Sequence, residues 1–115
     1  MEIGIDIEKN ERFIKFTDKM LKRIFTENEI SYAKRFSDSF IHFASMWCVK
    51  EAFIKATSEK NISLKSIEIA HKDDGKPYIE KNETISKILK TLGFTDIKIS
   101  ISNADDYSTA VCLIY

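Results

Sequence analysis

A long segment, residues 40–58, constrains the fold most, because it contains no glycine or proline and its apolar residues cover most of the circumference of a helix. A helix that is apolar nearly all round is covered by other elements on several sides. We therefore predict a helix that runs through the core, with Asp38 or Ser39 as its N-cap. The apolar positions are Phe40, Ile41, Phe43, Ala44, Met46, Trp47, Cys48, Val49, Ala52, Phe53, Ile54 and Ala56.

The segments before this helix predict one strand and two shorter helical regions. Apolar and polar residues alternate over residues 2–7, which predicts a half-buried strand with the isoleucines on one face. The charged segment 11–24 predicts helix in one or two pieces. Thr26 and Glu29 have the spacing of a capping box, which predicts a short helix that extends to about Phe36.

The segments after the long helix predict mainly strands. Two short strands, near 67–69 and 77–80, are separated by an Asp-Asp-Gly turn and predict a hairpin. A helix ended by Gly93 follows. Residues 97–101 alternate again, and residues 108–115 are apolar on both faces, as in a central strand. The order β-α-α-α-β-β-α-β-β predicts an α+β fold in which a mostly antiparallel sheet packs on the long central helix.

Length, charge and cysteine content narrow the functional class. The 115 residues contain no linker, so we expect a single domain over residues 1–115. Equal numbers of basic and acidic residues, 18 of each, argue against a polybasic protein that binds nucleic acid or membranes. The longest apolar run, 110–115, is too short to span a bilayer, and no signal-like core follows the first residue. Cys48 and Cys112 lack a metal-binding spacing, so we expect buried free thiols and a cytoplasmic protein.

Glu51 is the most informative polar residue of the long helix. Helical spacing places it in an otherwise apolar stripe with Phe40, Ala44, Trp47 and Ile54. Because desolvating a lone carboxylate costs several kcal/mol, Glu51 needs a proton, a partner or a metal ion. One alternative is an intrahelical ion pair with a lysine four residues on.

Asp6 is the second candidate. It shares a strand face with Gly4, whose missing side chain lets a ligand or backbone approach closely. An acid at the end of a strand is a suitable ligand for Mg²⁺, although it is also typical of a solvated turn. Asp6 and Glu51, together with Lys50 and Lys55, suggest a site that handles phosphate with a divalent metal.

Two motifs resemble the 4′-phosphopantetheinyl transferase superfamily: Gly4–Ile7, and Trp47–Ala56 with its Trp-x-x-Lys-Glu-Ala-x-x-Lys-Ala pattern. The short length and the segment Arg23–Glu29 resemble the holo-acyl-carrier-protein synthase branch. Gly75–Pro77 and Ser100–Ser102 match further stretches in the same order, so the resemblance covers nearly the whole chain.

The resemblance implies a specific reaction. Such enzymes move the 4′-phosphopantetheine arm of coenzyme A to a serine of acyl carrier protein and release adenosine 3′,5′-bisphosphate, a step that fatty acid biosynthesis requires. It implies Asp6 and Glu51 as Mg²⁺ ligands, Lys55 as a contact to the pyrophosphate, and Lys50 as a supporting residue or phosphate contact. Glu51 is also the candidate base for the serine hydroxyl, and the sequence leaves open whether it is base, ligand or both.

The resemblance also assigns residues to the nucleotide. Gly75, Lys76 and Pro77 would line the adenosine end, and Ser102 would contact the nucleotide. Asn103 stands where the family usually has histidine, and its amide can still donate a hydrogen bond to phosphate.

Two further departures lie on the coenzyme side of the expected site. Met46 replaces a commonly basic residue, and residues 57–61 replace a glycine-rich turn. They leave open a catalytically weak or silent relative that binds carrier protein or has a structural role. A small interaction or nucleic-acid module is a third alternative, which the neutral charge disfavours.

The resemblance finally implies two kinds of protein partner. Arg12 falls where the family carries an arginine that faces the acidic carrier protein, and Lys19 and Arg23 belong to a basic run suited to the same docking. This branch builds its sites between neighbouring protomers, so we expect a homotrimer.

Overall fold

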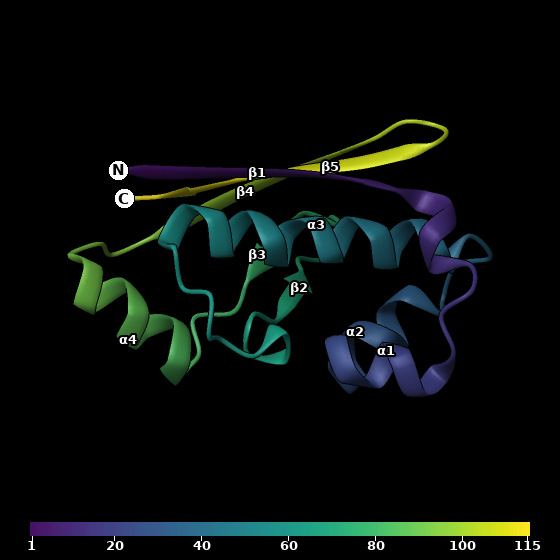
Figure 1. Ribbon diagram of the computed structural model, residues 1–115, viewed down its shortest axis with the longest axis horizontal. Helices are drawn as coiled ribbons and strands as arrows, with labels where there is room; N and C mark the ends of the chain where they lie inside the picture. The colour runs from purple at the N-terminus through teal and green to yellow at the C-terminus, as the bar shows by residue number, and fades with distance from the viewer.

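Helix α3 (Ser39–Thr57) lies between two layers in the computed structural model, which describes residues 1–115 (Figure 1). One layer is an antiparallel sheet, and the other contains the shorter helices and a hairpin. This arrangement confirms the predicted α+β class and the core helix. The elements in chain order are β1 (Glu2–Lys9), the 3₁₀ turn η1 (Asn10–Phe13), α1 (Asp18–Ile24), α2 (Glu27–Ala33), α3, the 3₁₀ turn η2 (Leu64–Ser66), β2 (Ile69–His71), β3 (Pro77–Ile79), α4 (Glu83–Leu92), β4 (Ile97–Asn103) and β5 (Tyr107–Ile114).

The main sheet has three strands in the order β1-β5-β4, all antiparallel. The apolar C-terminal strand is therefore central, as its sequence predicts. Strands β2 and β3 form a separate antiparallel hairpin. Helices α1, α2 and α4 lie on the side of α3 that faces away from the sheet (Figure 1), and the hairpin contacts the edge of the sheet through β3 and β4.

Strand β1 is half-buried, but its isoleucines face outward. Gly4 and Asp6 face α3, and an added Cβ at Gly4 would lie only 1.9 Å from the backbone oxygen of Ala52. The absence of a side chain at Gly4 therefore allows the strand to lie directly against the helix. On the other face, Ile3, Ile5 and Ile7 are each more than 60% exposed, at 64%, 62% and 62%. Hydrophobicity alone would place these side chains inside.

Local hydrogen bonds fix the predicted start of α2 and both ends of α4. Thr26 and Glu29 form the complete capping box of α2. Asn82 caps α4 by accepting a hydrogen bond from the backbone N–H of Ile85 at 2.9 Å. Gly93 ends α4 with φ 83°, in the left-handed region that favours glycine. Helix α2 ends at Ala33, three residues before the predicted end.

Twenty buried apolar residues form one cluster around α3. Cys48 and Cys112 belong to it as free thiols, which confirms that expectation. Burial raises the pKa of each thiol to about 12, and for Cys48 the charge of Asp6 adds to the effect. Both thiols therefore stay protonated and unreactive at neutral pH. No helix of the structure has the length and apolarity needed to cross a membrane.

Candidate active site

Asp6 and Lys55 meet across the interface between β1 and α3. The Lys55 Nζ atom lies 3.0 Å from Asp6 Oδ1 and also donates a hydrogen bond to the backbone oxygen of Ile5 at 3.0 Å. Lys55 is thus directed at the strand, and the alternative of an intrahelical ion pair with Glu51 is wrong. The lysine remains about half exposed, so an incoming anion can reach it.

Glu51 lies beside this pair in a half-buried position on α3. Burial raises the pKa of Glu51, and the negative charge of Asp6 raises it further, while Lys55 opposes the shift. Asp6 and Glu51 are therefore close enough to repel each other when both are ionised. A bound cation removes this repulsion and favours the charged form of both groups.

The second oxygen of Asp6, Oδ2, is buried and accepts no hydrogen bond. A buried acceptor without a partner is rare in folded proteins and marks a place for an ion, water or ligand. No three His, Cys, Asp or Glu side chains converge to enclose a metal by themselves. Mg²⁺ commonly takes one or two carboxylates and completes its shell with water and phosphate oxygens. Asp6 and Glu51 fit that donor set.

Glu8 and Arg12 extend the charged cluster. Arg12 lies 2.9 Å from Glu8 Oε2, and its guanidinium group lies 4.7 Å from the centre of the Trp47 ring. The charge of Glu8 raises the pKa of Glu51, and that of Arg12 lowers it. Glu8 was not predicted as a site residue, although the two-residue period of a strand places it on the same face as Asp6.

Lys50 cannot be a phosphate contact, so that part of the prediction is wrong. Its side chain is fully buried, and Nζ donates to Glu29 Oε1 at 2.9 Å and to the backbone oxygens of Leu64 and Ile67 at 2.7 Å each. These three bonds use every N–H of the ammonium group. Burial lowers the pKa of Lys50, and the charge of Glu29 opposes that shift. The supporting role that the resemblance allowed is the one that the contacts fit.

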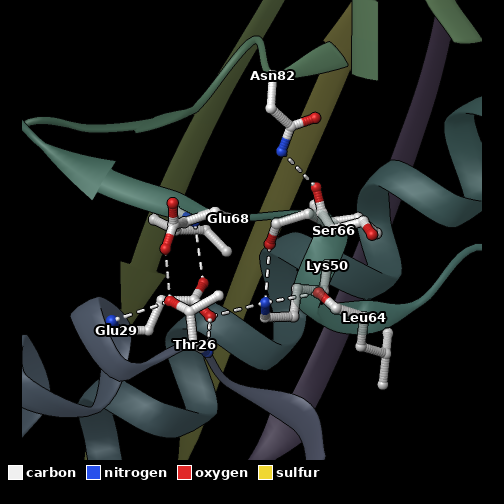
Figure 2. A network of polar contacts seen from close by, with 9 residues as sticks. Thr26, Glu29, Lys50, Leu64, Ser66, Glu68 and Asn82 are labelled. Carbon is white, nitrogen blue, oxygen red and sulfur yellow. Dashed lines mark hydrogen bonds and ion pairs between the residues drawn. The ribbon is translucent and has the colours of Figure 1, made fainter. Parts of the chain in front are cut away.

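The partner of Lys50 joins three elements of the fold (Figure 2). Glu29 Oε1 also accepts from the backbone N–H of Thr26 at 2.8 Å, and Oε2 accepts from that of Ile69 at 2.9 Å. The Thr26 hydroxyl donates in turn to Glu68. The sequence predicted the cap at Glu29, but no local pattern pairs this residue with Lys50, which lies 21 positions away.

Most of the residues predicted for the adenosine end lie around one cavity. Gly75, Pro77 and Asn103 line one cavity, together with Ser45 and Met46 of α3. Lys76 is exposed at the turn between β2 and β3, next to that cavity. The hairpin therefore brings most of this set together.

Asn103 does not serve as the predicted phosphate donor. Its amide nitrogen donates to the hydroxyls of Ser45 and Ser108 at 2.7 Å each, which uses both N–H groups. Ser102 is exposed on the outer face of β4, and its register partner on β5 is Thr109. Within one chain Ser102 therefore does not reach the cavity. Lys19 and Arg23 are exposed on α1.

Comparison with known proteins decides the family. The family model described as the 4′-phosphopantetheinyl transferase superfamily matches residues 2–112. The chain belongs to this superfamily. The resemblance drawn from the Gly4–Ile7 and Trp47–Ala56 motifs is thereby confirmed, and the protein is an enzyme, a phosphopantetheinyl transferase.

Relatives of this transferase match it along nearly their whole length. The holo-[acyl-carrier-protein] synthase of Leptospira biflexa serovar Patoc is 34% identical over 122 residues, which cover 100% of this chain and 96% of the relative. The crystal structure of the Neisseria meningitidis enzyme of the same name has a TM-score of 0.86 and 29% identity, with 99% and 97% covered. The Helicobacter pylori enzyme, solved in complex with coenzyme A, has a TM-score of 0.82 and 28% identity, with 98% and 99% covered.

Proposed function

We propose that this transferase is a holo-acyl-carrier-protein synthase. It would move 4′-phosphopantetheine from coenzyme A to a serine of apo acyl carrier protein in a Mg²⁺-dependent reaction that releases adenosine 3′,5′-bisphosphate. The observation that carries the proposal is the unpartnered, buried Oδ2 of Asp6 beside Glu51, with Lys55 at the same place. The names of the full-length relatives support the substrate pair.

The reaction exchanges one phosphorus–oxygen bond for another. The serine oxygen bonds to the phosphorus that carries pantetheine, and the bond from that phosphorus to the bridging pyrophosphate oxygen breaks. The nucleotide leaves with that electron pair, while the serine proton passes to a base. Glu51 is the candidate base, because its half-buried carboxylate lies beside the place where Asp6 and Lys55 meet.

The charged side chains of the site would supply binding and charge stabilisation. Asp6 and Glu51 would hold Mg²⁺, which when bound neutralises the pyrophosphate and orients the reacting groups. Lys55, which is half exposed, would turn from Asp6 toward the pyrophosphate and offset the charge on the departing oxygen. Positioning and charge stabilisation are the main demands of this chemistry, and no covalent intermediate is needed.

We propose that the active form is a homotrimer with its sites between protomers. The outer face of the sheet is apolar and open, with Ile3, Ile5 and Ile7 of β1 beside Val111 and Leu113 of β5. Three exposed isoleucines on one face of a strand are unusual on a surface that remains exposed to solvent. Ser102 lies on the same face, so a second copy that covered it would bring this residue toward a neighbouring site.

Arg12, Lys19 and Arg23 would guide an acidic carrier protein by electrostatic attraction. Of the three, Arg12 is the one whose charge lowers the pKa of Glu51. The enzyme would act in the cytoplasm, in fatty acid biosynthesis.

Calorimetric titration with coenzyme A, with and without Mg²⁺, tests the metal assignment. We expect Mg²⁺ to strengthen binding by at least about tenfold in the wild type and not in Asp6→Asn or Glu51→Gln. Glu83→Gln, an exposed charge removed from α4, is the matched control and should behave as the wild type does. Equal binding with and without Mg²⁺ in the wild type would overturn the assignment.

A further inference from the structure

Glu51 lies between two cations on one face of α3. Trp47, Glu51 and Lys55 follow one another at intervals of four residues, so their side chains share that face. Lys55 lies at one end of this row. At the other end, the guanidinium group of Arg12 lies 4.7 Å from the centre of the Trp47 ring. Each cation is therefore about one helical turn from Glu51 along the helix axis.

Each of the two cations is paired with a carboxylate of β1 and not with Glu51. Lys55 pairs with Asp6 at 3.0 Å. Arg12 pairs with Glu8 at 2.9 Å, and the two-residue period of the strand places Glu8 on the same face as Asp6. The Glu51 side chain forms no ion pair or hydrogen bond of its own. The two pairs thus leave its carboxylate free.

Arg12 would compete with a metal ion for Glu51 if it were not held elsewhere. A guanidinium group commonly forms a planar, two-point pair with a carboxylate and so occupies both of its oxygens. Burial raises the pKa of Glu51, and the charge of Arg12 opposes that rise, which means that the two groups attract each other. An Arg12 that closed on Glu51 would leave no oxygen for a divalent cation.

Two kinds of contact hold Arg12 in its present place. One is the ion pair with Glu8, which is its only ion-pair partner. The other is the stacking of the guanidinium group on Trp47 and, at 5.5 Å, near the ring of Phe13. The side chains of Arg12 and Glu8 are 43% and 23% exposed, and neither kind of contact is strong alone at an exposed position. Loss of the Glu8 charge would therefore be enough to release Arg12.

We propose that Glu8 is a positioning residue of this transferase, which holds Arg12 over Trp47 and so keeps the guanidinium group from pairing with Glu51. Glu8 acts through Arg12 and is not itself a metal ligand, since no three carboxylates converge to enclose a metal. The inference rests on the proposed function, because it takes Glu51 as a ligand of the divalent cation.

The first test measures the binding of Mn²⁺, which accepts the same oxygen ligands as Mg²⁺ and can be followed by the electron paramagnetic resonance of the free ion. We expect Glu8→Gln to weaken binding about tenfold and Glu8→Gln/Arg12→Gln to regain most of that loss. Arg12→Gln alone should change the affinity much less, because Arg12 is already held away from Glu51. Glu11→Gln, which removes an exposed charge from the same turn, is the matched control and should bind as the wild type does.

The two backgrounds separate positioning from simple charge attraction. If Glu8 only added negative charge near the ion, Arg12→Gln would strengthen binding by the same factor with and without Glu8. Equal factors in the two backgrounds would overturn the proposal. A Glu8→Gln variant with wild-type affinity for Mn²⁺ would overturn it as well.

The second test needs no metal, because Trp47 is the only tryptophan of the chain and its fluorescence comes from the ring next to Arg12. Glu8→Gln should shift the emission of Trp47 in the same direction as Arg12→Gln, since both changes remove the guanidinium group from the ring. A wild-type spectrum in Glu8→Gln would overturn the proposal. Failure of the proposed function would look different, because even the wild type would then not bind Mn²⁺, whereas the emission would still show whether Glu8 holds Arg12.

Discussion

Replacing Lys50 with methionine tests the buried ion pair that holds α3 to α2. Methionine occupies a similar volume in the core, but it leaves the buried Glu29 carboxylate without a counter-charge. Removing one partner of a buried pair costs about 3–5 kcal/mol, whereas a domain of this size has about 5–15 kcal/mol in total. We expect Lys50→Met to lose about 3–5 kcal/mol of the free energy of unfolding.

The measurement is urea unfolding at fixed protomer concentration, followed by circular dichroism. The matched control is Lys50→Met/Glu29→Gln, which should recover part of the loss because no unpaired charge stays buried. Glutamine keeps an oxygen that can accept from Thr26 or Ile69. The backbone oxygens of Leu64 and Ile67 lose their donor in both variants, so recovery stays partial.

The pH dependence of the single variant gives a second check. In this variant the buried Glu29 carboxylate has no counter-charge, and protonation removes that uncompensated charge, so the loss of stability grows as the pH rises. The deficit of Lys50→Met should therefore shrink toward pH 5. Unchanged stability at neutral pH would refute the account of the ion pair. Unchanged stability together with lost coenzyme A binding would instead indicate that Lys50 contacts a phosphate of coenzyme A.

Three further changes probe the site, the strand below it and the open face. Gly4→Ala should lower the free energy of unfolding by about 1–3 kcal/mol or more, because the added Cβ would collide with the backbone of Ala52. Thermal unfolding measures this loss, and a wild-type melting temperature would contradict the close packing of β1 on α3. Glu51→Gln should abolish transfer, measured by product formation, without loss of stability. Transfer retained by this variant would refute the catalytic role of Glu51. Because the pKa of Glu51 is raised in the folded state, the free energy of unfolding of the wild type should fall as the pH rises through that pKa. The glutamine variant should lack this pH dependence. If the proposed trimer forms through the outer face of the sheet, Ile5→Lys should yield monomers in light scattering, whereas an unchanged mass would show that this face is not the interface.

Much of the fold could be predicted because local chemistry sets it. The capping box of Thr26 and Glu29, the left-handed end at Gly93 and the two-sided apolar strand β5 are signals contained within a few residues. Helix α3 is apolar on most faces, and a helix of this kind is stable in water only when other elements bury it. These elements therefore lie where their sequences predict.

The errors arise where contacts join distant segments. No residue near Lys50 in the sequence indicates that it pairs with Glu29. Its position next to the candidate catalytic residue Glu51 therefore suggested a phosphate contact. The isoleucines of β1 predict a buried face, yet Gly4 is the residue that allows contact with α3. Asp6 and Glu51 were predicted from their chemistry, and the fold brings them together.

Intact-mass spectrometry of apo acyl carrier protein tests whether this protein transfers 4′-phosphopantetheine in a Mg²⁺-dependent reaction. The carrier is incubated with this protein, coenzyme A and Mg²⁺, and a parallel sample contains a chelator. We expect a mass gain of one phosphopantetheine that disappears with the chelator. No gain on a carrier that another transferase can modify would contradict it and favour a catalytically silent relative.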